Sequence, residues 1–228
     1  LLMWNGRVGW FATMAQDPPE PPMVVPLCTL ANDMRRMLED TSTTDVTFIV
    51  GSEREPICAH RSIIKTRCEY FNALLSGGFV EEGMQRVNII DTTPIVFRMM
   101  LEWLYTNEIE ALQPSEAIEV MQLASKYCIQ PLLQKCEMII KPYVDYDNVS
   151  TIFAISSSCN AKQLMSYCVY YGRKYQIKLI SIVNNENVES LYLLATQARL
   201  VELQTACQPY LSPLGKEERY VFLVLFVF

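Results

Sequence analysis

The sequence predicts an α+β fold: three short strands among helices, followed by all-α helical hairpins. Two observations predict it. Short segments of alternating apolar residues lie among helical patterns in the first half of the chain. A helix–turn–helix pattern then recurs from residue 123 onward. Half of the 228 residues are apolar, so the chain can bury a core of this size.

The N-terminal part predicts a linker and then one amphipathic helix. Five prolines fall within residues 17–26, so residues 1–26 are expected to be a linker or disordered. Residues 27–40 carry Leu30, Met34 and Leu38 at helical spacing, with charged residues off that stripe. This spacing predicts a helix with one apolar face.

The next part predicts the sheet and its first helices. Residues 45–50 alternate apolar and polar, and a turn at residues 51–52 leads to a returning strand at 56–58. Short helices follow over 60–65 and from residue 68, and a third strand is expected at 87–90. Pro94 is tolerated in a first helical turn, which predicts a helix running to residue 105.

From residue 123 the chain repeats a Leu–Cys pattern at intervals of 32 and then 39 residues. A helical hairpin cannot bury its apolar face alone, so the repeats predict successive stacked hairpins from residue 123 onward and core positions for their cysteines. Residues 212–228 form an apolar tail of uncertain structure. The repeated positions are Leu123, Leu132 and Cys136; Ile155, Leu164 and Cys168; and Leu194, Leu203 and Cys207.

The chemistry of the chain argues against an enzyme. His60 is the single histidine, so sites with two or three histidines are impossible within one chain. No phosphate-binding loop and no Gly-x-Ser-x-Gly elbow is present. We therefore predict no catalytic, metal-binding or cofactor-binding residues and no cofactor. His60 is expected to be a structural ring.

Charge and hydropathy limit the partners. The net charge of −6 gives no basic face for nucleic acid. The longest apolar run, residues 221–228, is far shorter than the roughly 20 residues of a membrane helix. We expect neither direct nucleic-acid binding nor a membrane span.

The eight cysteines indicate an intracellular protein, in the cytoplasm or the nucleus. No two of them are separated by only two residues, so the usual zinc and thioredoxin spacings are absent. Free cysteines commonly behave as small buried hydrophobes. A cysteine-based stress sensor remains the alternative interpretation.

An ordered set of short motifs resembles the BTB (POZ) domain over residues 27–142. Residues 143–211 resemble the BACK extension that commonly follows such domains. The resemblance implies a small three-stranded sheet wrapped by helices, and an interaction module without catalysis. The motifs are Asp45-Val46-Thr47-Phe48-Ile49-Val50, Ala59-His60-Arg61 and Cys68-Glu69-Tyr70-Phe71, followed in order by segments 79–82, 87–89, 101–106 and 123–132.

The resemblance implies a homodimer. In such dimers the helix before the first strand forms the interface, which here assigns Leu30, Met34 and Leu38 to it. The alternative is that this stripe caps the domain's own core. Asp45 and Arg61 match a charged pair that lies near the interface in dimeric members.

The resemblance also implies docking to cullin-3, the scaffold of a ubiquitin ligase. Phe79, Val80 and Glu81 match the hydrophobic-x-Glu motif of cullin-3 adaptors, although Phe79 could instead fold back onto the domain. Residues 147–171 match the helices that extend the cullin groove. The expected partners are a second copy, cullin-3 and an unknown substrate recruited by a domain elsewhere in a longer protein. The alternative is a non-ligase scaffold, or a dimerisation module of the transcription-regulator type.

Overall fold

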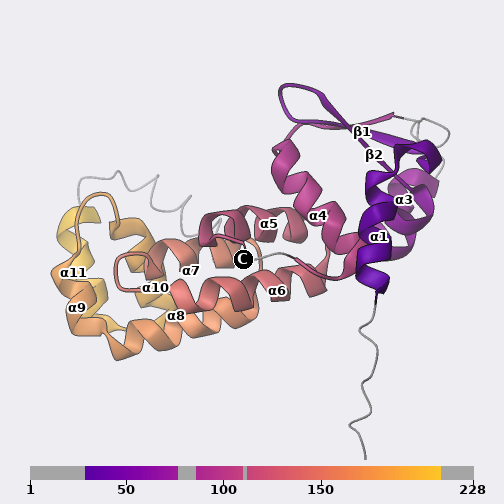
Figure 1. Ribbon diagram of the computed structural model, residues 1–228. Coiled ribbons are helices and arrows are strands. Elements are labelled where there is room, and N and C mark those ends of the chain that lie inside the picture. The colour runs from indigo at the N-terminus through magenta and orange to yellow at the C-terminus, as the bar shows by residue number, and fades with distance from the viewer. Residues whose placement is uncertain (1–28, 77–85, 110–111, 212–228) are drawn as a thin grey trace, which may run out of the picture.

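The computed structural model describes residues 29–76, 86–109 and 112–211. The whole of the predicted linker at residues 1–26 and the whole apolar tail at 212–228 lie outside these ranges. Figure 1 shows a sheet with its helices at one end of the molecule and stacked helices extending from it.

The sheet has three strands in the order β2–β1–β3. Strand β1 (Val46–Val50) pairs antiparallel with β2 (Glu55–Ala59) and parallel with β3 (Arg86–Ile89). Val46, Phe48 and Val50 are buried on one face, which confirms the alternation in the sequence. The turn after β1 needs a positive φ, and Gly51 adopts +73° there at no steric cost.

Helices surround this sheet. They are α1 (Leu30–Glu39), α2 (Arg61–Arg67), α3 (Glu69–Ser76) and α4 (Pro94–Thr106), with a 3₁₀ turn at Thr41–Thr43. Pro94 stands in the first turn of α4, as predicted, and Thr93 precedes it as the N-cap. The ring of Phe48 lies 5.4 Å from that of Phe71 and 5.1 Å from that of Phe97, which joins the sheet to α3 and α4.

The predicted helical hairpins are confirmed. They are α5 (Pro114–Lys126) with α6 (Gln130–Ile140), α7 (Val149–Ser158) with α8 (Lys162–Lys174), and α10 (Val188–Ala198) with α11 (Val201–Leu211). The repeated Leu and Cys of each second helix are buried, as their helical spacing requires.

The three hairpins share one turn geometry. Each turn holds a single residue in the left-handed region: Cys128, Asn160 and Arg199, with φ of 57°, 54° and 57°. In each turn the following amide donates to a carbonyl five residues back at 2.8 Å. This is the hydrogen-bond pattern of a helix C-terminus closed by a left-handed residue. The repeat seen in the sequence is therefore a structural repeat.

One helix, α9 (Gln176–Ser181), was not predicted. It lies between the second and third hairpins and accounts for their longer spacing in the sequence. The loops before α7 and α10 match each other. Asn148 and Asn187 stand at the N-cap positions, and each side chain accepts an amide three residues back. The Asn148 side chain makes no hydrogen bond to the helix, and its amide group instead stabilises the loop that precedes it.

One hydrophobic cluster runs through the whole described fold, from Val46 in the sheet to Cys207 in the last hairpin. In Figure 1 the α5–α6 hairpin lies between the sheet and the later hairpins, and α9 and α11 lie at the far end. The extension therefore continues the packing of the first domain.

Candidate protein–protein interface

Helix α1 carries the residues predicted to form a dimer interface. None of its residues is fully buried in the single chain. Met34 and Leu38 are half-buried and pack against the core, whereas Leu30 is 63% exposed. The inner part of the apolar stripe therefore caps the domain's own core, and its outer part faces solvent. The core-capping interpretation thus describes Met34 and Leu38, and the dimer interface stays a prediction.

Ion pairs between α1 and the α4 region fix the orientation of this stripe. Arg35 Nε donates to Glu102 Oε1 at 2.8 Å, and the same guanidinium lies 3.7 Å from Glu108. On the outer face of α1, Arg36 pairs with Asp33. Because Arg35 and Glu102 are partly shielded from solvent, their pair stabilises α1 more than an exposed pair would.

The structure brings Asp45 and Arg61 together. The Arg61 backbone N–H donates to Asp45 Oδ1 at 2.6 Å, and Arg61 Nε donates to the Asp45 carbonyl at 3.4 Å. Asp45 therefore caps the N-terminus of α2, where an anion is favoured. Asp45 is exposed and Arg61 is half-buried in the single chain.

His60 is a structural ring, as predicted. It is 5% exposed. Its Nδ1 and its backbone N–H both lie 2.8 Å from the hydroxyl of Tyr105, and its Nε2 lies 2.8 Å from Thr43 Oγ1. Burial raises the pKa of Tyr105 to about 12, so the phenol stays neutral. Both ring nitrogens of His60 are thus engaged in holding β2, α4 and the turn after α1.

The predicted cullin-binding residues Phe79, Val80 and Glu81 lie outside the described residues. Their segment connects α3 to β3. The helices predicted to extend the cullin groove, residues 147–171, correspond to α7 and most of α8.

Glu137 is a residue that sequence reasoning missed. It is 3% exposed on α6, and its Oε1 accepts the amides of Gln163 at 2.9 Å and Leu164 at 3.1 Å. These are N–H groups of the first turn of α8, which have no partner within that helix. The signal in the sequence was a glutamate on the apolar face of α6, between Cys136 and Ile140. Glu137 ties the extension to the first domain.

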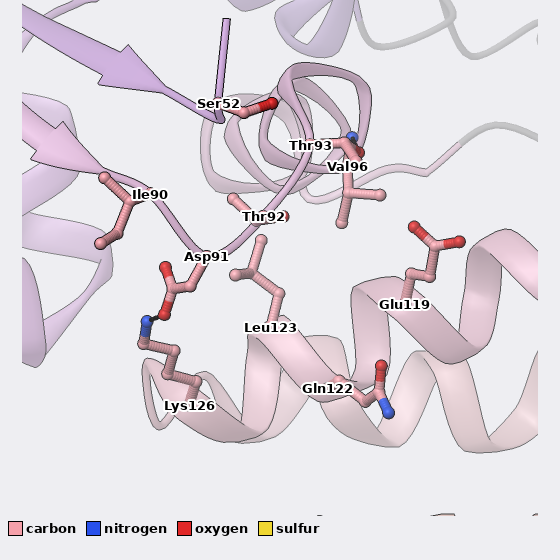
Figure 2. A pocket seen from close by; sticks show the side chains of 10 residues that line it. All are labelled: Ser52, Ile90, Asp91, Thr92, Thr93, Val96, Glu119, Gln122, Leu123 and Lys126. Carbon is pink, nitrogen blue, oxygen red and sulfur yellow. Dashed lines mark hydrogen bonds and ion pairs between the residues drawn. The ribbon is translucent and has the colours of Figure 1, made fainter. Parts of the chain in front are cut away.

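A hollow of about 470 Å³ lies beyond the ends of β1 and β3, beside α5. Figure 2 shows Lys126 reaching from α5 to Asp91, with which it forms an ion pair. The remaining walls are mostly hydroxyl and aliphatic groups, with Glu119 and Gln122 on the α5 side. The mixed charge of this lining favours neither an anion nor a cation.

The cysteines do not resemble redox sites. Among the seven in the described ranges none forms a disulfide, and five are buried. Burial raises the pKa of Cys136 and of Cys168 to about 12, and that of Cys207 to about 11. Reactive thiols have lowered pKa values, so these positions favour packing over sensing.

The described residues contain no group of three or more His, Cys, Asp or Glu side chains arranged to hold a metal ion. Within the same ranges, no helix has the length and apolar character needed to cross a bilayer.

Comparison with known proteins identifies the first domain. The family model of the BTB/POZ domain matches residues 34–143. BTB/POZ domain-containing protein 9 of Drosophila melanogaster is 31% identical over 142 residues, which cover 61% of this chain and 19% of that protein. BTB/POZ and MATH domain-containing protein 3 of Arabidopsis thaliana is 25% identical over 181 residues, which cover 75% of this chain and 44% of that protein.

Among solved structures, the BTB domain of zebrafish PATZ1 aligns with a TM-score of 0.42 and 21% identity, over 53% of this chain and 99% of that one. The chain spans less than half the length of either curated relative. BTB domains typically homodimerise, bind partner proteins and are generally without catalytic activity. Residues 34–143 of this chain are thus a BTB/POZ domain, a protein–protein interaction module.

Proposed function

We propose that this chain is a homodimeric adaptor that docks cullin-3 and brings a substrate protein to it for ubiquitination. The observation that carries the proposal is the apolar stripe of α1, which the single chain leaves partly uncovered at Leu30. The adaptor requires no cofactor and acts inside the cell, in the cytoplasm or the nucleus.

The geometry of α1 supports the proposed dimer. Leu30, Met34 and Leu38 lie on one helix face, and a two-fold axis places this face against itself. Full burial of one leucine side chain contributes about 2 kcal/mol, so two copies of Leu30 make a substantial contribution. Asp45 and Arg61 belong to the same interface, where a second copy would shield their contacts from water.

The dimer is tested by analytical ultracentrifugation of wild type and Leu30→Asp. We expect a dimer for wild type and a shift toward monomer for the variant, because two carboxylates would face each other across the axis. Val201→Asp is the matched control, since Val201 is 70% exposed on α11, in the last hairpin. Sedimentation of Leu30→Asp as a stable dimer would remove α1 from the interface.

Docking to cullin-3 is proposed for Phe79, Val80 and Glu81 together with α7 and α8. The motif stands in the connection between α3 and β3, and two helices follow the domain where an extended groove needs them. An aromatic side chain can anchor in a partner's pocket, and a neighbouring carboxylate can add an orienting charge-assisted hydrogen bond.

This docking is tested by capture on the immobilised N-terminal domain of cullin-3. We expect wild type to be retained and Phe79→Ala with Glu81→Ala to be lost, while Glu82→Ala is retained. Circular dichroism checks that each variant folds. Equal capture of wild type and the double variant would contradict the motif, and a dimer that is never captured would favour the non-ligase scaffold.

A further inference from the structure

A surface on the extension gathers tyrosines and lysines around α8, one of the two helices assigned above to the cullin-3 groove. The tyrosine patch comprises six residues from the 3₁₀ turn Lys141–Tyr143 after α6, the loop before α7, α8 and the residue that follows α8. Tyr143 and Tyr170 are 54% and 58% exposed, and the other four are half-buried. The six residues are Tyr143, Tyr146, Tyr167, Tyr170, Tyr171 and Tyr175.

The rings on α8 form a continuous row. The ring of Tyr167 lies 6.2 Å from that of Tyr170 and 6.4 Å from that of Tyr171, and the ring of Tyr171 lies 4.5 Å from that of Tyr175. Residues three and four apart meet on one helix face, which explains the row. Tyr167 and Tyr171 are half-buried and pack against the core beside the buried Leu164 and Cys168, whereas Tyr170 faces solvent. The row therefore runs from the edge of the core to an exposed ring.

Three lysines lie close to tyrosine rings of the patch. Lys178 Nζ lies 3.5 Å from the ring centre of Tyr146, Lys141 Nζ lies 4.9 Å from that of Tyr167, and Lys174 Nζ lies 5.2 Å from that of Tyr175. These are distances at which a cation is attracted to an aromatic face. The three contacts place the ammonium groups around the tyrosine patch, on the turn after α6, in the last turn of α8 and on α9.

The charge of these lysines is not neutralised nearby. Within the described ranges the ion pairs involve arginines and Lys126, and none includes Lys141, Lys174 or Lys178. Asp145 interacts electrostatically with Tyr171, so one carboxylate stands beside the three ammonium groups and does not balance their charge. On a chain with a net charge of −6, the patch is a local cationic site.

We propose that the tyrosine patch and its three lysines bind an acidic segment of a partner protein. Carboxylates of that segment pair with the lysines, and its apolar atoms pack on the tyrosine rings. Tyrosines are enriched among residues that dominate binding energy, because they bury a large area and lose little conformational entropy. The inference goes beyond the proposed function, since it holds whether or not cullin-3 docks at residues 79–81.

The test uses the full 228-residue chain and a fluorescein-labelled peptide of alternating glutamate and serine. Fluorescence anisotropy measures its binding, with the matched glutamine–serine peptide as the neutral probe. We expect the acidic peptide to bind more tightly, and its affinity to fall with added salt, because salt screens exposed charges. Equal binding of the two peptides, or binding by neither, would overturn the proposal.

Two sets of variants locate the binding. Lys141→Ala with Lys178→Ala should lower the affinity for the acidic peptide at least about tenfold. This loss corresponds to two charge-assisted contacts at a solvent-exposed site. Lys65→Ala with Lys135→Ala removes the same charge outside the patch and should leave affinity unchanged. If both pairs weaken binding equally, net charge alone explains it and the patch is not the site.

The tyrosines are tested separately. Tyr170→Ser should weaken binding severalfold, whereas Tyr210→Ser, at another partly exposed tyrosine on α11, should not. A labelled oligothymidylate is the competing probe, because single-stranded nucleic acid also uses aromatic rings and lysines. Tighter binding of that oligonucleotide than of the acidic peptide would overturn the assignment to a protein partner. The assay contains no cullin-3, so its outcome is independent of the capture experiment.

Discussion

Removing the Glu137 carboxylate should destabilise the chain more than any exposed substitution. Glu137 is buried on α6, and one of its oxygens accepts two amides of the first turn of α8. In Glu137→Ala these amides lose their acceptor in a site that water reaches poorly. Loss of a helix N-cap costs about 1–2 kcal/mol, and a buried unsatisfied group costs about 1–3 kcal/mol. We expect a total loss of about 2–4 kcal/mol.

Glu137→Gln separates the hydrogen bonds from the charge. Its amide oxygen can still accept from Gln163 and Leu164, so only the attraction between the charge and the N-terminus of α8 is lost. That contribution is about 1 kcal/mol. The order of stability should therefore be wild type, then Glu137→Gln, then Glu137→Ala.

Urea unfolding followed by circular dichroism measures these differences. A loss of 3 kcal/mol lowers the urea midpoint by roughly 1 M for a chain of this size. Glu119→Ala, on the exposed side of α5, is the control and should change stability by less than about 0.5 kcal/mol. A Glu137→Ala midpoint equal to that of wild type, or equal losses for Ala and Gln, would refute the role assigned to this carboxylate.

Three further predictions concern the core. Tyr105→Phe removes the hydroxyl that both the backbone N–H and the ring Nδ1 of His60 contact. It should lower the free energy of unfolding, measured by thermal unfolding, by about 1–3 kcal/mol, whereas Tyr127→Phe should lower it much less. Gly172→Leu should lower the melting temperature by overpacking, because a Cβ there would already lie 3.3 Å from Leu194. In thiol titration of the native protein, Cys128 should react first among the described cysteines. The buried cysteines should react only on unfolding, because burial raises their pKa. Fast modification of a buried thiol at neutral pH would contradict this.

Local patterns in the sequence predicted most of the fold. The alternation at residues 45–50 and the proline at residue 94 are local signals, and the structure follows both. The repeated Leu–Cys spacing predicted the hairpins because each repeat is one structural unit. Helix α9 was not predicted, because it occurs only in the connection between the second and third hairpins and is therefore not part of the repeat.

The polar contacts that hold the fold were not predictable in the same way. Glu137 finds its partners 26 and 27 residues later, and Asp45 caps a helix that begins 16 residues later. Such pairs depend on how the elements pack, which no local pattern reports. Asn148 differs from them, since it stands at an N-cap position and its side chain serves the loop just before the helix. Long-range contacts decided the roles of Glu137 and Asp45.

The boundary predicted at residue 143 divides a structure that packs continuously. The α5–α6 hairpin belongs to the matched BTB/POZ region and is also the first of the three hairpins that share a turn geometry. Two polar contacts cross to the next hairpin: Glu137 to the first turn of α8, and Ser125 Oγ to the carbonyl of Cys159 at 3.0 Å. Such contacts, together with a shared core, oppose hinge motion between the two parts. A dimer formed through α1 would therefore hold its two extensions, and both tyrosine patches, in one fixed arrangement. Partner proteins bound to the two extensions would then be held at a distance that the fold sets, rather than one that a flexible linker allows.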